Sequence, residues 1–188
     1  MMMKDVNMNI TVTGMIGRRN DKAKLIEAAE FFAAQLMDPR MVRNLTLDIE
    51  VWKDLDIEGE CVDEEGIKNP RWFTIGLKNQ GIEEMIKVLG HEMVHVKQHA
   101  KNELQTGHAV AARGGLKIFS KWMGQIWKPK GKEDAYFDAP WEIEAYGREV
   151  GLYHKWCATQ KTAYNDKLAD DLANVFKWVF REKVIRCV

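Results

Sequence analysis

Residues 82–104 read IEEMIKVLGHEMVHVKQHAKNEL and carry a helical pattern of apolar residues. These residues recur every three or four positions, which is the spacing of one face of an α-helix. No proline interrupts the run, so one continuous and mostly buried helix is predicted. Gly90 costs about 1 kcal/mol relative to alanine in a helix interior, and its presence is consistent with a close backbone approach. The apolar face comprises Ile82, Met85, Ile86, Leu89, Met93 and Val96.

The segments before this helix predict several strands. Apolar and polar residues alternate over short runs, as expected where one face of a strand is buried. One of these strands directly precedes the helix. The predicted strands cover residues 6–12, 45–51, 57–62 and 72–77.

Three further helices are predicted from apolar residues at helical spacing, over about 22–37, 140–156 and 168–180. Asp38-Pro39 ends the first of them, because the residue before a proline avoids helical geometry. A turn is predicted at 105–107, and residues 119–127 look extended or irregular. The fold class predicted is α+β, with a small mixed sheet packed on the central helix, in a single domain over residues 1–188.

The composition indicates an ordinary globular protein of 188 residues, 46% hydrophobic and 30% charged. Lys+Arg and Asp+Glu are equal at 28 each, so the charge balance gives no sign of a nucleic-acid-binding surface. No apolar run approaches the roughly 18 residues of a membrane span, and the first residues lack the apolar stretch of a signal peptide. A cytoplasmic protein is expected, since its cysteines, in no metal-like spacing, are typical of reduced thiols: Cys61, Cys157 and Cys187.

The pentapeptide His91-Glu92-Met93-Val94-His95 lies within the central helix and has the chemistry of a metal site. Residues four apart share one helix face, so both histidines can aim a ring nitrogen at one ion. Glu92 lies about 100° around the helix, where it can reach a metal-bound water without binding the metal. The alternative is that both histidines are satisfied core groups and Glu92 is a surface charge. That alternative places three polar side chains in an apolar helix without compensation, which is costly.

A catalytic zinc site needs a third protein ligand and one open position. His99 continues the series but lies about 12 Å along the axis from His91, too far to share an ion. A ligand six residues after the motif, the spacing that metzincins use, would be Lys101, which excludes that class. Two candidates remain open, namely His108 after the predicted turn and Glu142 at the start of a later helix.

The pair HEMVHVKQ (91–98) and PWEIEA (140–145) resembles the gluzincin-type zinc metallopeptidases and small phage and bacterial zincin-like proteins. The resemblance implies a zincin-like domain that binds Zn2+ through His91, His95 and Glu142. It also implies that Glu92 acts as general base on a zinc-bound water, with a peptide or protein as substrate. A phage-encoded member would work in the host cytoplasm. Glu144 would point away from the metal.

The chain departs from this pattern at one position. Several gluzincin families carry an Asp four residues after the ligand glutamate, where this chain has Tyr146. Asp138 or Glu149 could take over the support of a histidine. A catalytically weak or inactive zincin-fold binding protein is therefore a second hypothesis. His108 keeps open a third, a SprT-like protease that acts with DNA.

The sequence offers several candidates for an oxyanion donor, without a choice among them, and one for a strand that pairs with substrate. An oxyanion donor could come from Tyr136, Tyr146, Tyr153 or His154. Zincins pair an extended substrate with an edge strand, so the strand before the motif helix is the candidate for that contact. Its residues are Trp72, Phe73, Thr74, Ile75, Gly76 and Leu77. Nothing in the sequence indicates an oligomeric state or a membrane partner.

Overall fold

The computed structural model describes residues 8–17, 19–110, 116–129 and 136–160 of the chain. The chain divides into two compact units, Met1–Leu152 and Tyr153–Val188. All but one of the elements below lie wholly in the first unit, and the described part of the second unit, residues 153–160, contains the end of the last helix. The expectation of one domain over 1–188 stays a prediction, and the helix expected at 168–180 lies outside the described residues.

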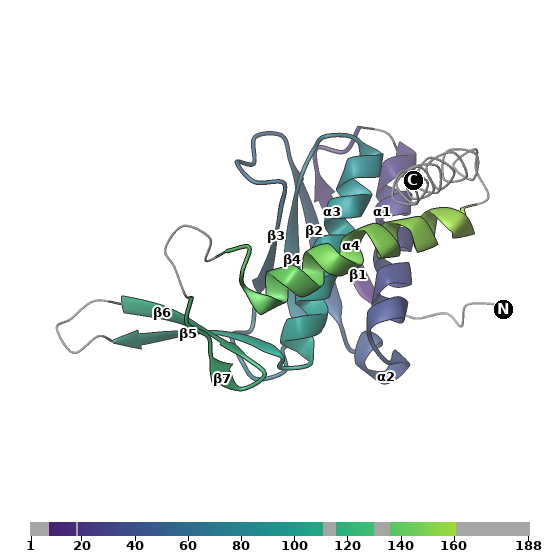
Figure 1. The fold of residues 1–188 in the computed structure, drawn as a ribbon. Coiled ribbons are helices and arrows are strands. Elements are labelled where there is room, and N and C mark those ends of the chain that lie inside the picture. The colour runs from purple at the N-terminus through teal and green to yellow at the C-terminus, as the bar shows by residue number, and fades with distance from the viewer. Residues whose placement is uncertain (1–7, 18, 111–115, 130–135, 161–188) are drawn as a thin grey trace, which may run out of the picture. The chain divides into compact units, whose positions relative to one another are not determined.

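A four-stranded mixed sheet forms the centre of the first unit (Figure 1). Its strands follow the order β1-β2-β4-β3, so β1 and β3 are the edges. β1, β2 and β4 run parallel, and β3 is antiparallel to β4. Alternate residues of β2 and β4 are buried, as the alternating sequence requires. The strands are β1 (Asn9–Gly14), β2 (Thr46–Trp52), β3 (Gly59–Asp63) and β4 (Trp72–Lys78).

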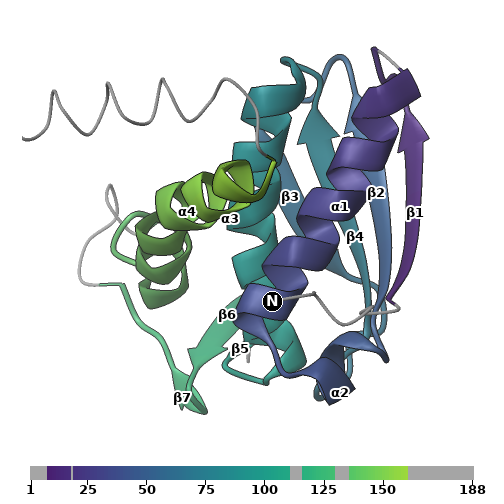
Figure 2. The same ribbon diagram turned by 90° about the vertical axis from the view of Figure 1, so that its right-hand side faces the viewer.

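Two helices, α1 (Arg19–Leu36) and α3 (Ile82–Ala100), lie side by side on one face of this sheet (Figure 2). Their apolar faces and the inward residues of the sheet form the core. Pro39 begins the short helix α2 (Pro39–Val42), whose first amides Asp38 caps at 3.0 and 3.1 Å. The fully buried core side chains include Leu25, Phe32, Ile49, Ile75 and Met93.

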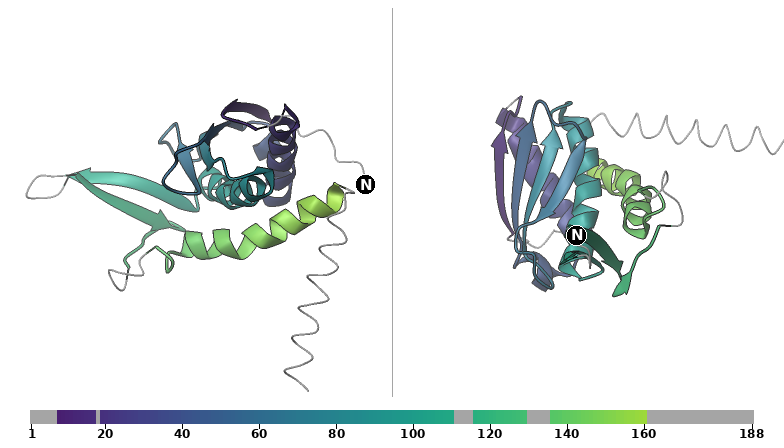
Figure 3. Two further views of the ribbon diagram at one scale, coloured as in Figure 1. Left: turned by 90° about the horizontal axis from the view of Figure 1, so that it is seen from above. Right: turned by 90° about the vertical axis from the view of Figure 1, so that its left-hand side faces the viewer.

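Helix α4 (Pro140–Thr159) begins in the first unit, and α3 lies between the sheet and this first part of α4, up to Leu152, as the view from above shows (Figure 3). α3 is therefore enclosed on opposite sides, which is why its polar side chains near α4 are buried. Between α3 and α4 the chain forms a second, antiparallel sheet in the order β5-β6-β7. These strands are β5 (Leu104–Val110), β6 (Leu116–Trp122) and β7 (Gln125–Ile126). No helix among the described residues is long and apolar enough to cross a membrane.

The predicted α+β class, with a small mixed sheet packed on the motif helix and further helices around it, is confirmed. The turn predicted at 105–107 is wrong, because those residues lie inside β5. The chain reverses earlier, at Asn102, which adopts a left-handed conformation with φ 60°. Residues 119–127, expected to be extended or irregular, contribute to β6 and β7.

Two glycines beside the motif have different roles. A Cβ added at Gly90 would meet the Phe32 ring at 3.6 Å and a backbone oxygen at 3.9 Å, which are ordinary contacts. The tight approach expected at Gly90 is therefore not present. At Gly59 of β3 a Cβ would lie 2.4 Å from Val88 and 2.9 Å from Oε1 of Glu92, so no larger residue fits. At Gly59 the strand thus packs directly against Val88 and the motif glutamate of α3.

Candidate metal centre

The three predicted ligands converge from two helices of the first unit. His91 and His95 lie one turn apart on α3, and Glu142 lies in the first turn of α4. All three residues are less than one-tenth exposed. Nε2 of His91 lies 3.2 Å from Nε2 of His95 and 3.4 Å from Oε2 of Glu142, and Nε2 of His95 lies 3.6 Å from the same oxygen. The three atoms therefore form a nearly equilateral triangle.

This triangle has the dimensions of one face of a tetrahedral metal site. Ligand atoms about 2.0–2.1 Å from a tetrahedral ion lie about 3.4 Å from one another, and the observed separations are 3.2–3.6 Å. Oε2 of Glu142 is also buried without a hydrogen-bond partner. A buried acceptor without a donor is costly, and a cation in the middle of the triangle would satisfy it. The three residues could thus hold a metal ion.

The hydrogen bonds of Gln98 determine which nitrogen of His95 is free. Nε2 of Gln98 donates to the Trp141 carbonyl at 2.9 Å and to Glu144 at 3.1 Å, so its Oε1 is the atom that faces His95. That oxygen lies 2.9 Å from Nδ1 of His95 and can only accept. Nδ1 therefore carries the hydrogen of the neutral ring, and Nε2 offers its lone pair to the centre of the triangle.

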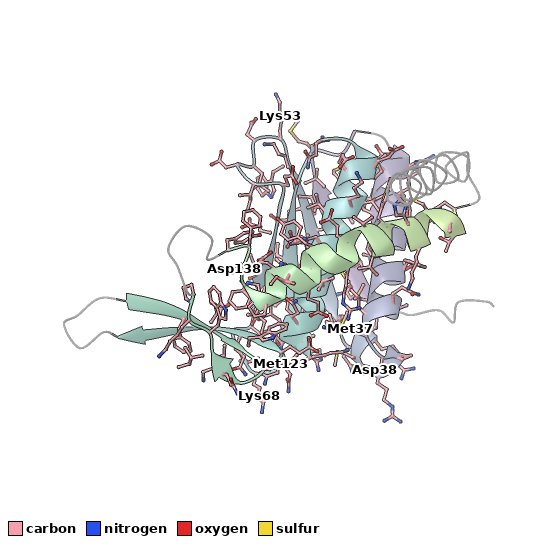
Figure 4. The ribbon with its side chains drawn as sticks, viewed as in Figure 1. Met37, Asp38, Lys53, Lys68, Met123 and Asp138 are labelled. Atoms are coloured by element: carbon pink, nitrogen blue, oxygen red, sulfur yellow. The ribbon has the colours of Figure 1, made fainter. Side chains whose placement is uncertain are left out.

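Glu149 determines in the same way which nitrogen of His91 is free. Its carboxylate lies 3.3 Å from Nδ1 of His91, which leaves Nε2 as the atom that faces Glu142. Glu149 thus occupies the supporting position that the sequence left open between two carboxylates. Asp138, the other candidate, is exposed before α4 (Figure 4). Tyr146 stacks edge-on against the His91 ring, with centroids 4.6 Å apart.

Glu144 turns away from the triangle, as expected. Its carboxylate lies 2.7 Å from the buried Lys97 ammonium, which also pairs with Glu103 at 2.6 Å. On the solvent side, Nε of Arg148 lies 2.8 Å from Oε1 of Glu144. Because Glu144 also accepts from Gln98, this ion-pair network holds the amide that orients His95.

The ionisable groups of the triangle have displaced pKa values. Burial alone would lower the pKa of His91, but the nearby carboxylates of Glu142 and Glu149 outweigh burial and raise the pKa to about 9. Burial would raise the pKa of Glu142, but the rings of His91 and His95 outweigh burial and lower it to about 2. A proton on His91 thus takes the place of a cation in the metal-free chain.

Glu92 lies in a pocket of ≈460 Å³ beside the triangle. The residue is buried, and burial, only partly opposed by His95 and His91, raises its pKa to about 7. A carboxylate with this pKa can accept a proton near neutral pH and release it again. The pocket is lined by Ile57, Glu58, Gly59, Val88, His91, Tyr136, Tyr146 and Glu149 in addition to Glu92.

The structure separates the four candidates for an oxyanion donor. Tyr136 and Tyr146 line the pocket that contains Glu92. Burial and the nearby Glu142 carboxylate raise the pKa of Tyr136, so its phenol keeps its proton and can donate it in a hydrogen bond. Tyr153 and His154 belong to the second unit, where their rings lie 5.9 Å apart, and no role at the metal centre is assigned to them.

Two other predicted positions have different outcomes. The strand expected to bind substrate, Trp72–Leu77, falls in β4, which pairs with β2 on one side and β3 on the other. β4 therefore has no open edge, and that prediction is wrong; the edge beside the pocket belongs to β3. His108 lies in β5 with its backbone opposite Ile118, and its side chain lies outside the part of the structure described. Its role as alternative ligand stays a prediction.

Sequence reasoning missed Gln98 and Gly59. Gln98 is three residues after His95 on the same helix, a spacing that could have indicated a contact. Gly59 gave no such signal, because its neighbour Glu92 is far away in sequence. No protein-family model, curated protein or solved structure matches the chain.

Proposed function

We propose that the protein is a zinc-dependent metallopeptidase in which His91, His95 and Glu142 bind the ion. The observation that carries the proposal is the triangle of two imidazole nitrogens and one carboxylate oxygen, 3.2–3.6 Å apart, beside a buried Glu92. Two nitrogens and one oxygen are a ligand set that zinc accepts in catalytic sites. The resemblance of the two motifs to gluzincin-type peptidases supports the same assignment.

Zinc bound there would supply Lewis-acid polarisation and make water easier to deprotonate at neutral pH. Glu92 takes one proton from the attacking water and delivers it to the nitrogen of the leaving amine. The water oxygen bonds to the carbonyl carbon while the carbon–nitrogen bond breaks, so one carboxylic acid and one amine form from one peptide and one water, and the acid then passes its proton to the amine or to solvent. Tyr136 or Tyr146 donates a hydrogen bond to the carbonyl oxygen as negative charge develops on it.

Substitution of Glu92 by glutamine tests this function. Glu92→Gln keeps the size of the side chain but cannot accept the proton, so zinc content is retained and kcat falls by about 10²- to 10⁴-fold. The assay is hydrolysis of a mixed peptide library by the zinc-loaded chain, with products identified by mass spectrometry. Glu83→Gln, an exposed residue of the same helix, is the matched control and leaves turnover unchanged.

The outcomes separate the proposal from its main alternative. Hydrolysis that chelation abolishes and Glu92→Gln removes supports the peptidase. Bound zinc without hydrolysis of any peptide by the wild-type chain would instead indicate a binding protein built around the same metal site. Undiminished hydrolysis by Glu92→Gln would exclude the role given to Glu92.

A further inference from the structure

A second pocket, of ≈250 Å³, lies at the C-terminal end of α3. It is formed by the loop after β3, the last turn of α3 and the start of β5. Lys53, in the loop before β3, and Lys68, in the loop after it, lie at opposite ends of the sheet (Figure 4). The polar residues that line the second pocket are Asp63, Lys68, His99, Asn102, Gln105 and Thr106.

The strand β3 runs from one pocket to the other. Its first residue, Gly59, lines the pocket of Glu92, and its last residue, Asp63, lines the second pocket. Four residues of strand span about 13 Å. On α3 the eight residues from His91 to His99 span about 12 Å. The strand and the helix thus connect the two pockets over the same distance.

The backbone of β3 has one open edge along this path. The Lys78 N–H donates to the Glu58 carbonyl at 3.0 Å, and the Glu64 N–H donates to the Trp72 carbonyl at 3.1 Å. Such bonds recur at every second residue of an antiparallel pair, so the even-numbered residues of β3 bond to β4. The odd-numbered residues present their N–H and C=O groups to the open edge, and these are Gly59, Cys61 and Asp63.

The side chains of these odd-numbered residues face α3. Gly59 abuts Val88 and Glu92 of that helix, and exposure along β3 alternates, with Glu60 and Val62 outside. A residue paired directly opposite Asp63 projects its side chain to the same face as Asp63. A strand added to this edge would therefore direct one side chain into the second pocket.

The lining of the second pocket is largely polar and has balanced charge, and its apolar members are Ile67, Pro70 and Leu104. Lys68 supplies an ammonium and Thr106 a hydroxyl, and Asp63 supplies a carboxylate whose Oδ1 already accepts from the Glu65 and Gly66 amides. Burial lowers the pKa of His99, so its ring is neutral at pH 7. Groups that both donate and accept hydrogen bonds, without net charge, match an amide side chain better than an aliphatic or an ionised one.

We propose that the second pocket is a distal specificity subsite for Asn or Gln in an extended substrate segment that pairs antiparallel with β3. Antiparallel pairing is slightly more stable than parallel pairing, and it places the residue in the pocket about four positions before the bond that is cut. The substrate is then an extended stretch of polypeptide rather than a dipeptide. This inference rests on the proposed peptidase function, which supplies the reacting end of the segment.

The test uses one peptide that the zinc-loaded chain cleaves, made in three forms: with Gln four residues before the cut, with Leu there, and truncated to two residues before the cut. Affinity for the Glu92→Gln chain is measured by fluorescence anisotropy, and kcat/KM is measured with the wild type. The Gln peptide is expected to bind about tenfold more tightly than the other two. Thr106→Trp fills the pocket and removes that preference, whereas Thr13→Trp, on an exposed position of β1, leaves it intact.

The outcomes distinguish the subsite from the function it rests on. Unchanged binding of the truncated peptide to Thr106→Trp shows that the variant is folded and that only the second pocket is lost. Equal affinity for the three peptides, with cleavage retained, overturns the subsite alone. A fourth form, with Leu before the cut and Gln four residues after it, tests the register, and tighter binding of that form than of the Gln peptide overturns the antiparallel pairing. Absence of cleavage of any peptide overturns the proposed function and the subsite with it.

Discussion

The histidines of α3 form two sites that share one helix and one spacing but differ in chemistry. His91 and His95 face α4, which contributes Glu142 and Glu149, and Gln98 of α3 itself contacts His95. His99, four residues further on, lies beside Phe73 of β4 with the rings tilted and their centroids 6.4 Å apart, and it lines the second pocket. Contacts with carboxylates raise the pKa of His91 to about 9, and burial lowers that of His99.

The difference shows that the four-residue spacing selects candidate metal ligands. The helix or strand that packs opposite each histidine decides which of them can bind. Each step of four residues advances about 6 Å and turns about 40° around the helix. The first pair of histidines therefore meets the start of α4, whereas the third meets the sheet. The same imidazole becomes a candidate ligand where a carboxylate faces it and a neutral ring where an aromatic side chain does.

Removing a histidine from each site gives the largest expected contrast. His95→Ala lowers zinc affinity by more than about hundredfold, since even supporting residues of a metal site contribute 10- to 100-fold. His99→Ala changes the affinity less than about twofold, because His99 is too far from the triangle to bind the same ion. Competition with a chelator and elemental analysis measure both variants. Zinc lost on His108→Ala but retained on Glu142→Ala would move the third ligand to β5.

Weakening the support of His91 gives a smaller effect. Glu149→Gln keeps the shape of the side chain but removes the negative charge beside Nδ1, so zinc affinity falls by about 10- to 100-fold. Asp138→Asn, at the exposed carboxylate that the sequence left as an alternative, serves as the matched control and leaves the affinity unchanged. The same chelator competition measures both, and a larger loss with Asp138→Asn would reverse the assignment.

The pH dependence of stability gives a contrast of another kind, with opposite signs at the two sites. In the metal-free chain, His91 has a folded-state pKa of about 9 against an ordinary 6.5. Protonated His91 therefore makes its full contribution to the free energy of unfolding below pH 6.5. This contribution, at most about 3 kcal/mol, is lost by pH 9. The pKa of His99 is lowered, so its neutral ring favours folding above pH 6.5 and opposes it as the pH falls.

Denaturant unfolding with chelator present, from pH 5 to 9.5, measures these contributions as differences from the wild type. His91→Gln removes the loss of stability between pH 6.5 and 9, and His99→Gln removes the loss on the acid side. Saturating zinc also abolishes the loss of stability between pH 6.5 and 9, because the ion displaces the proton from His91. If His91→Gln still lost stability between pH 6.5 and 9, the loss could not be assigned to His91.

Much of the fold follows from local pattern. The periodicity of residues 82–100 and the alternation in β2 and β4 indicated a buried helix and half-buried strands, and the structure has both. The turn expected at 105–107 failed because a chain reversal depends on backbone angles, here at Asn102, that composition does not specify. The edge of the sheet was misassigned for a related reason, since strand order is set by pairing across the whole unit.

The sequence by itself determined which side chains could act together within one helix. Helical geometry places His91, Glu92 and His95 on adjoining faces whatever the rest of the chain does. Only the tertiary structure brought Glu142 and Glu149 from α4 to those histidines, put Gly59 against Glu92 and made β3 the open edge. The physical reason is that local spacing follows from backbone geometry, whereas distant residues meet only when burial of apolar faces fixes how helices and strands pack.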